Sequence, residues 1–156
     1  VNNYQKEKQF IRLNEVAEGR KKMTVLRNGE QVELHQDKLV VGDIVMLTEG
    51  MEIPTDGFLI KSSEVTIDES AMTGESDAIK KNTIDKCRNK ADDVKKSANP
   101  LKPIGRHDVP SPIILSGTKL LTGEGLMLVI VLGELSCLGK IRELITQKEE
   151  EETPLQ

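Results

Sequence analysis

The sequence predicts a mainly β domain with a distorted jelly-roll or β-sandwich core and flanking N- and C-terminal helices. Three observations support this fold class. At least six short apolar runs of strand length are separated by turn residues. An Asn-Gly pair stands between two runs in which apolar and polar residues alternate, which is typical of a hairpin. Helical spacing of apolar residues is found near the two ends. The length of 156 residues suits a single domain spanning 1–156.

The first predicted element is a helix over residues 4–19, which Gly19 can end. Its apolar face consists of Phe10, Leu13, Val16 and Ala17. The hydrophobic period then changes, and residues 23–34 read as a hairpin. Asn28 and Gly29 can adopt the positive φ angles of a type I′ turn between its two strands.

The next strand-like runs are residues 39–50 and 56–60, separated by a turn containing Pro54, Asp56 and Gly57. "EVTI", residues 64–67, predicts another short strand. Later in the chain, residues 111–121 and 125–133 predict a strand pair around "TGEG". The last element is a helix over residues 134–152. Its apolar stripe is made by Leu135, Leu138, Ile141, Leu144 and Ile145.

Residues 80–111 interrupt this pattern and are called the insert below. Nine Lys or Arg stand here against four Asp, with few apolar side chains and with Pro100, Pro103 and Pro110. This composition predicts a basic, flexible loop. A plain solvated loop is the favoured interpretation. The alternative is a contact with acidic lipid headgroups or with an acidic regulatory segment.

Composition excludes several classes of function. A net charge of −4 and only three aromatic residues argue against a nucleic-acid partner. The longest apolar run, Leu126 to Leu132, is far shorter than a membrane helix. The sequence contains no metal-ligand spacing and no phosphate-binding glycine loop, so we expect no metal and no cofactor in this domain. Cys87 and Cys137 are expected as free thiols, and His35 and His107 as surface residues. The polar start without Met predicts a piece of a longer chain.

The candidate functional residues lie in "AMTGES", residues 71–76. From these residues alone a surface turn is the favoured interpretation, with Gly74 in the turn and Glu75 in solvent. The chemistry also fits a hydrolytic loop. An ionised carboxylate at Glu75 can orient a water and accept its proton. Gly74 lets the backbone approach a phosphoryl group, and the Thr73 hydroxyl can donate to phosphoryl oxygens.

The wider context favours the hydrolytic interpretation. "VGDIVMLTEGMEIPTDGFLI", "IDESAMTGES" and "SGTKLLTGEGLMLVIVLGELSCLGKI" occur in this order, and together they resemble the actuator domain of P-type ATPases. Thr55 and Met72 depart from the family pattern, where Ala and Leu are common. The positions that match are Val41, Gly42, Asp43, Pro54, Asp56, Gly57, Asp68, Glu69, Ser70, Thr73, Gly74, Glu75, Ser76, Ser116, Gly117, Thr118, Gly125, Gly133, Gly139 and Lys140.

The resemblance implies that Glu75, Thr73, Gly74 and Ser76 form the catalytic loop that hydrolyses an aspartyl phosphate held on another domain. "NNYQKEKQF", "TGESDAIKK" and "ETPLQ" are similar to plasma-membrane-type calcium pumps. The chain would then be the cytosolic loop between the second and third membrane helices, at the cytoplasmic face of a membrane. Its partners would be the phosphorylation and nucleotide-binding domains and the membrane helices. The full pump would use ATP and Mg²⁺ and transport Ca²⁺, whereas the fragment alone would be inactive.

Two alternatives remain at this stage. The first is a P-type pump for another ion, because selectivity in this family depends on membrane segments outside the 156 residues. The second belongs to a different class of protein, a stand-alone β-sandwich binding module in which the TGES string is coincidental.

Overall fold

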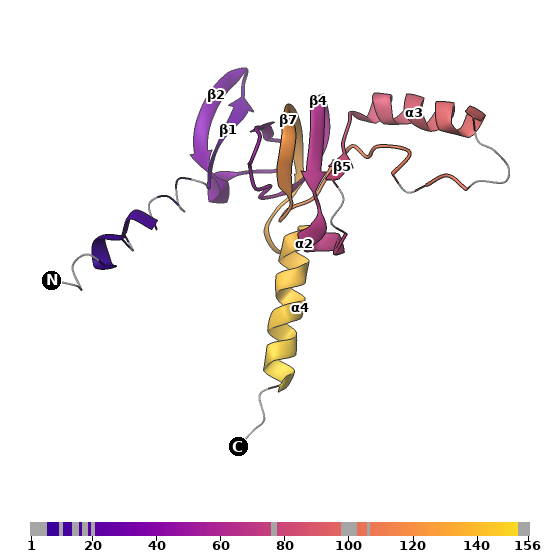
Figure 1. The fold of residues 1–156 in the computed structure, drawn as a ribbon. Helices are drawn as coiled ribbons and strands as arrows, with labels where there is room; N and C mark the ends of the chain where they lie inside the picture. Colours follow the sequence, from indigo (N-terminus) through magenta and orange to yellow (C-terminus); the bar gives the residue numbers. More distant parts are fainter. Residues whose placement is uncertain are drawn as a thin grey trace.

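The structure is a computed structural model that describes residues 6–9, 11–13, 16, 19, 21–75, 78–97, 103–105 and 107–152. It consists of a β-sheet body from which two longer helices project, α3 beside the sheet and α4 below it (Figure 1). The mainly β class is therefore confirmed. The strands are β1 (Lys22–Arg27), β2 (Glu30–His35), β3 (Ile44–Leu47), β4 (Asp56–Asp68), β5 (Ala78–Lys80), β6 (Ile113–Ile114) and β7 (Lys119–Val131).

The strands form one antiparallel sheet in the order β2-β1-β3-β7-β4-β5, and β6 pairs separately with β4. The helices among the described residues are η1 (Gln36–Lys38), α2 (Ser70–Thr73), α3 (Ile84–Ser97), η2 (Gly133–Leu135) and α4 (Cys137–Glu152). The sequence order of a hairpin, further strands and a final helix is thus reproduced. The predicted order did not include α2 or α3.

The predicted hairpin is confirmed. β1 pairs with β2 in a register that places Arg27 opposite Glu30, so that Asn28 and Gly29 form a two-residue turn. Both turn residues have positive φ, 53° for Asn28 and 81° for Gly29. These angles are those of a type I′ turn, whose twist matches the twist of the flanking strands.

The prediction of a strand pair around "TGEG" is wrong. Residues 119–131 form one continuous strand, β7, because Gly123 makes a bulge instead of a turn. Gly123 has a φ of 85°, and a Cβ at this position would collide with backbone atoms of Ser63 and Glu64 on β4. Glu64 also has positive φ, 49°. The runs expected as two strands at 56–60 and 64–67 are likewise joined in β4, which bends at the same level.

The bends fold the long β4–β7 ribbon back on itself. An extended strand rises by about 3.3 Å per residue, so the 13 residues of β4 could span roughly 40 Å. Yet α2, which follows the last residue of β4, Asp68, contacts the start of α4 through Met72. The start of α4 is bonded to Asp56, the first residue of β4. Register shifts between β4 and β7 at four places account for this curvature.

The curved sheet encloses one aliphatic core. Its buried side chains come from β1, β3, β4, β6 and β7 and from the connections between them, and both halves of β4 contribute. A single core shared by all these strands is what makes the sheet a distorted roll instead of two separately bonded sheets. The members are Met23, Val25, Leu39, Val45, Leu47, Ile53, Leu59, Val65, Ile67, Ile114, Leu120, Met127 and Val129.

The two predicted terminal helices differ from expectation in their packing. Residues 6–9, 11–13, 16 and 19 are helical, but Phe10 and Ala17 lie outside the described residues. At the other end, α4 begins at Cys137, so Leu135 belongs to η2 and is 73% exposed. Leu144 and Ile145 are also exposed, because α4 leaves the sheet after its first turns. Its expected apolar stripe therefore packs only at Leu138 and Ile141, which are half-buried.

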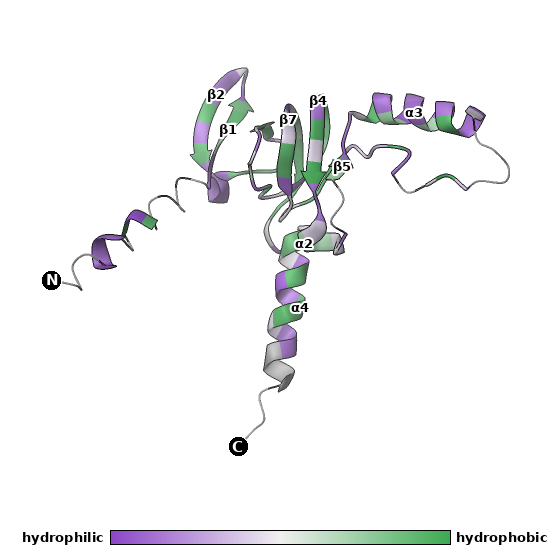
Figure 2. Ribbon diagram, viewed as in Figure 1, coloured by the Kyte–Doolittle hydropathy of each residue, from purple (hydrophilic) through white to green (hydrophobic). Residues whose placement is uncertain are grey.

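The insert contains a helix that composition alone did not predict. α3 spans Ile84–Ser97, and the three prolines of the insert all lie beyond its end. Asp85 in its first turn and Lys95 and Lys96 in its last turn suit the helix dipole. Figure 2 shows mixed polar and apolar residues along α3. Of its side chains, Cys87 is buried, whereas Ile84 is 48% exposed. The mobility of the insert remains a prediction.

Candidate functional site

The TGES segment forms a tight helical turn directly after β4. α2 is four residues long, and Gly74 ends it in the left-handed conformation with a φ of 74°. The Gly74 N–H donates to the Ser70 carbonyl at 2.8 Å. This conformation favours glycine. The Glu69 carbonyl accepts from the N–H of Thr73 at 2.9 Å and from its hydroxyl at 3.1 Å, which fixes the start of the turn.

Glu75 follows this turn at the rim of the domain. Its N–H donates to the Thr73 hydroxyl oxygen at 3.3 Å, so the helical turn sets its backbone position. The Glu75 side chain is 41% exposed, and its Oε2 lies 3.7 Å from Nε2 of His107 on the returning arm of the insert. The side chain is therefore partly exposed while its backbone is held, although the Oε2 atom itself is buried.

The structure brings three of the four predicted site residues together. Thr73, Gly74 and Glu75 form the turn just described. Ser76 lies outside the described residues. No local sequence pattern connects His107 with this site, because 32 positions separate it from Glu75.

α2 packs against the start of α4. Met72 Sδ lies 4.0 Å from Cys137 Sγ. The φ of Gly117 is 79°, and a Cβ there would approach the Met72 and Leu138 side chains at 2.6 and 3.1 Å. Burial raises the pKa of the Cys137 thiol, and the nearby Asp56 carboxylate adds to this effect. Both Cys137 and Cys87 are free, as predicted. The turn that presents Glu75 is thus in direct contact with the helix that leaves the domain.

Three side chains bind the first N–H groups of α4. Asp56 Oδ2 accepts from the Cys137 N–H at 2.8 Å, and Ser116 Oγ accepts from the Leu138 N–H at 2.9 Å. Ser136 Oγ accepts from the Gly139 N–H at 3.2 Å. Asp56 Oδ1 also accepts from the Ser116 N–H at 2.7 Å. Because the first N–H groups of a helix have no partner within it, these bonds fix the origin of α4.

Two carboxylates before α2 have separate partners. Asp68 Oδ1 accepts from the Ser70 N–H at 2.9 Å, and the bonds from Ser70 lower the pKa of Asp68. Glu69 Oε1 lies 2.5 Å from Lys81 Nζ, and both side chains are less than a tenth exposed. This ion pair joins the two ends of the segment that carries Glu75. Glu69 is one of the positions that match the family pattern, whereas nothing in the sequence indicated a role for Lys81.

The other matched carboxylate, Asp43, lies on the opposite side of the sheet order, before β3. Arg27 donates to both its oxygens at 2.7 Å, and the Val40 N–H donates to Oδ2 at 2.9 Å. The bond from Arg27, followed by that from Val40, holds the pKa of Asp43 below its usual range although burial opposes this. Asp43 therefore braces the β1–β3 region and does not belong to the Glu75 site.

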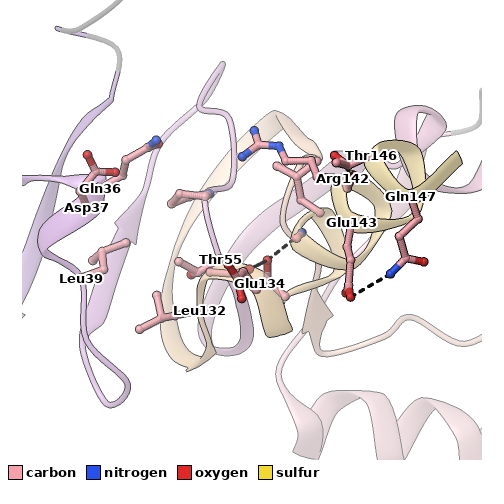
Figure 3. A pocket seen from close by; sticks show the side chains of 15 residues that line it. Gln36, Asp37, Leu39, Thr55, Leu132, Glu134, Arg142, Glu143, Thr146 and Gln147 are labelled. Carbon is pink, nitrogen blue, oxygen red and sulfur yellow. Dashed lines mark hydrogen bonds between the residues drawn. The ribbon is translucent and has the colours of Figure 1, made fainter. Parts of the chain in front are cut away.

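A broad cavity on the described surface is also separate from Glu75. It is a cavity of about 930 Å³ between η1, the Pro54–Thr55 turn and α4. In Figure 3, Gln36 and Asp37 lie on one side, and Arg142, Glu143, Thr146 and Gln147 of α4 on the other. Thr55 lines it, and its buried hydroxyl has no hydrogen-bond partner among the described residues. This cavity contains no part of the turn that presents Glu75.

The described residues show neither a metal-binding cluster nor a helix that could span a membrane. Among these residues, no three His, Cys, Asp or Glu side chains gather as a metal ion would require. None of the helices in the part of the chain that the structure describes has the length and apolar content needed to cross a bilayer.

Comparison with known proteins decides which family the fold and the loop belong to. The family model of the P-type ATPase actuator domain matches residues 18–146. The chain belongs to this family. The resemblance inferred from the motifs is thereby confirmed, and the coincidental TGES string of a stand-alone binding module is ruled out. The actuator domain described here includes the Glu75 turn, Asp56 and the first turns of α4 within the matched range.

Curated relatives of this actuator domain include several calcium-transporting ATPases. The chain is 38% identical over all its 156 residues to calcium-transporting ATPase 2 of Cryptococcus neoformans. It is 39% identical over 145 residues, 93% of the chain, to the plasma membrane calcium-transporting ATPase mca-1 of Caenorhabditis elegans. Over 151 residues, 97% of the chain, it is 35% identical to human plasma membrane calcium-transporting ATPase 4. The actuator domain spans 10% of the length of each of these relatives.

A solved structure with the same fold is that of a zinc-transporting PIB-type ATPase in the E2.Pi state. It aligns with a TM-score of 0.62 over 87% of this chain and 18% of the other, at 24% sequence identity. At this identity the likeness establishes the fold of the actuator domain and nothing about its substrate.

Proposed function

We propose that this chain is the actuator domain of an ATP-driven calcium-transporting P-type ATPase. The observation that carries the proposal is the presentation of Glu75, a partly exposed carboxylate whose backbone is held by Thr73 and by the left-handed Gly74. The relatives named as calcium-transporting ATPases support the choice of ion. The pump as a whole is then an ATPase and translocase, and the fragment alone has no turnover.

In this proposal the Glu75 turn serves the hydrolysis of an aspartyl phosphate on another domain of the same chain. Glu75 orients a water and accepts its proton as the water attacks the phosphorus in line. Gly74 keeps the backbone free of a side chain at the point of approach, and among the described residues no atom beyond its chain neighbours lies within 4 Å of where its Cβ would be. Thr73 and Ser76 complete the catalytic loop. The Thr73 hydroxyl donates to the Glu69 carbonyl and accepts from the Glu75 N–H, so its part is to hold Glu75 in place.

Electrostatics explains why such a carboxylate belongs on a movable domain. Two unit negative charges 4 Å apart repel by about 4 kcal/mol at an effective dielectric of 20. A glutamate fixed beside the phosphorylation site would oppose formation of the phosphoenzyme. A domain that brings Glu75 to the phosphate only when hydrolysis is due avoids this cost during phosphorylation.

The same movement would act on the membrane through α4. Met72 contacts Cys137, and Asp56 and Ser116 bind the first N–H groups of α4, so the turn and the helix move as one unit. Both ends of the chain would continue into membrane helices, with the domain at the cytoplasmic face of a membrane. Rotation of the domain is then transmitted to the ion gates.

The remaining ligands and partners are assigned by the same proposal. ATP and Mg²⁺ act at the nucleotide-binding and phosphorylation domains, and Ca²⁺ is cargo that crosses through membrane segments. The insert, with its excess of basic residues, is either a solvated segment or a contact for acidic lipid headgroups. No nucleic-acid partner is part of the proposal.

A pump for a different ion is the second candidate. It stays open because ion selectivity in this family depends on membrane segments outside the 156 residues. Phosphorylation assays on the full-length protein distinguish the two candidates. A calcium pump requires Ca²⁺ for phosphorylation from ATP, whereas a pump for another ion does not.

The test of the catalytic role is a phosphoenzyme chase in the full-length pump. Glu75→Gln should still be phosphorylated from ATP but should lose its phosphate about 10²- to 10⁴-fold more slowly, the usual worth of general-base assistance. Glu124→Gln, which changes an exposed carboxylate on β7, is the matched control and should decay like the parent. Equal decay of Glu75→Gln and the parent would show that Glu75 is not the base.

A further inference from the structure

The segment that carries Glu75 is closed at its base by a buried ion pair. Glu69 stands immediately before α2, and Lys81 immediately after β5. Their charged atoms are 2.5 Å apart, with 7% of the Glu69 side chain and 4% of the Lys81 side chain exposed. The bonded path from this pair to Glu75 runs through the Glu69 carbonyl and the Thr73 hydroxyl.

Such a path runs from Lys81 to Glu75. Lys81 pairs with the Glu69 carboxylate. The Glu69 carbonyl in turn accepts from the N–H groups of Met72 and Thr73 and from the Thr73 hydroxyl. The Thr73 hydroxyl oxygen then accepts from the Glu75 N–H. Every link is a direct bond or ion pair of 2.5 to 3.3 Å.

The backbone of Lys81 is fixed as firmly as its side chain. Its N–H donates to the Val65 carbonyl of β4 at 2.9 Å, and Lys81 forms a parallel bridge with Ser111. The neighbouring Asn82 N–H donates to the Ser111 carbonyl at 3.3 Å. Lys81 therefore stands where the two arms of the insert meet the sheet. The ion pair joins this junction to the turn that presents Glu75.

Stability alone is a weak reason to bury these two charges. The desolvation of a buried ion pair offsets most of its attraction, and an apolar pair of similar volume often serves equally well. What an ion pair adds is a single preferred arrangement of its partners. The need for one arrangement is greatest at a turn whose carboxylate must meet a water within a few tenths of an ångström.

We propose that Lys81 and Glu69 are positioning residues for Glu75, and that the junction of the insert thereby sets the rate of dephosphorylation. This inference rests on the proposed function, because it assigns to the pair the orientation of the base. The cavity of about 520 Å³ beside the pair is lined by Glu69, Lys81, Ser111 and His107. A movement of the insert arms therefore reaches the pair without passing through the main core.

The test uses the full-length pump and two matched double variants. Glu69→Gln with Lys81→Met removes both charges while keeping volume, which avoids leaving one charge buried alone. Arg27→Met with Asp43→Asn does the same to the other well-bonded ion pair, on the far side of the sheet order. The first should be phosphorylated from ATP like the parent yet lose its phosphate at least about tenfold more slowly. The second should decay within about threefold of the parent.

Two further variants separate positioning from a merely structural role. Adding Glu75→Gln to the neutral Glu69–Lys81 variant should slow decay no more than Glu75→Gln alone, since residues that act as a unit are not additive. Lys81→Arg restores the charge and should recover most of the parental rate. The inference is overturned if the neutral variant decays like the parent, if its effect multiplies with that of Glu75→Gln, or if the Arg27–Asp43 variant slows decay equally. Parental decay of Glu75→Gln alone instead overturns the proposed function.

Discussion

The two projecting helices of this domain are of similar length but are attached in opposite ways. The N-terminus of α4 is bonded by Asp56, which is 81 positions away in sequence, and by Ser116, 22 positions away. At the start of α3 the corresponding bonds are local: Thr83 N–H to Asn82 Oδ1, Cys87 N–H to the Thr83 carbonyl and Cys87 Sγ to the Asn82 carbonyl.

This difference shows which helix can transmit motion. A helix whose origin is bonded to two distant parts of the sheet must follow the sheet when it rotates. A helix held by its own neighbours and one buried side chain, Cys87, can open locally at low cost. α4 is therefore suited to act as a lever. The insert, although it contains α3, can respond to its own contacts without moving the sheet.

The largest expected effect concerns the origin of α4. Asp56→Ala removes two charge-assisted bonds and leaves the N–H groups of Ser116 and Cys137 without a partner. Such a loss costs about 3 kcal/mol of unfolding free energy. Asp85→Ala, in the first turn of α3, should cost no more than about 0.5 kcal/mol. Urea unfolding of the 156-residue chain measures both, and equal costs would contradict the comparison.

A second, smaller effect should appear in limited proteolysis. Trypsin should cut the 156-residue chain first within the insert, at sites such as Lys90 or Lys95. Cleavage at Lys140 and Arg142 in α4 should be at least about tenfold slower, because it requires breaking the bonds to Asp56 and Ser116. Mass spectrometry of early digests identifies the order of cuts. First cleavage at Lys140 in the parent would reverse our ranking of the two helices.

The smallest expected effect concerns a third region, the ion pair of Arg27 and Asp43, from which no helix projects. Asp43→Asn should lower the unfolding free energy by about 1 kcal/mol at pH 7 through the weakened bonds to Arg27. The folded-state pKa of Asp43 is depressed, chiefly by the bond from Arg27, so its contribution is complete above the unfolded pKa near 3.9. It is lost as the pH falls through the folded value.

The measurement is the difference in unfolding free energy between parent and Asp43→Asn from pH 7 to pH 3. That difference should shrink steadily below about pH 4. Asp37→Asn, which changes a carboxylate that is 73% exposed, is the control and should stay close to the parent at neutral pH. A difference that stays constant down to pH 3 would show that the bonds from Arg27 do not stabilise the ionised form.

Features fixed by neighbouring residues were predictable from the sequence. The Asn28-Gly29 turn and α4 depend on local chemistry and spacing, and both are present. The prediction of a strand pair around "TGEG" was wrong because a glycine such as Gly123 is compatible with either a turn or a bulge. The choice is made by Ser63 and Glu64, about 60 positions earlier. α3 was not predicted because the many charged residues of the insert obscured an apolar stripe at helical spacing, made by Ile84, Cys87, Ala91 and Val94.

The candidate site divides in the same way. The motif proposed Thr73, Gly74 and Glu75 from residue type within four positions, and the structure places the three in one turn. Lys81 and His107 were not identified. Their relation to the turn depends on how the insert returns to the sheet, through the bridge between Lys81 and Ser111. No spacing rule contains that information.

The doubled-back β4–β7 ribbon has a mechanical consequence. β4 begins at Asp56, which accepts from the Cys137 N–H of α4, and ends just before α2, whose Met72 contacts Cys137, so both of its ends lead to the start of α4. Force applied to α4 therefore reaches the turn through the contact of Cys137 with Met72, without passing along the length of β4. The turn that carries Glu75 and the helix that leaves the domain thus share one attachment point, so a displacement of α4 moves the turn with it.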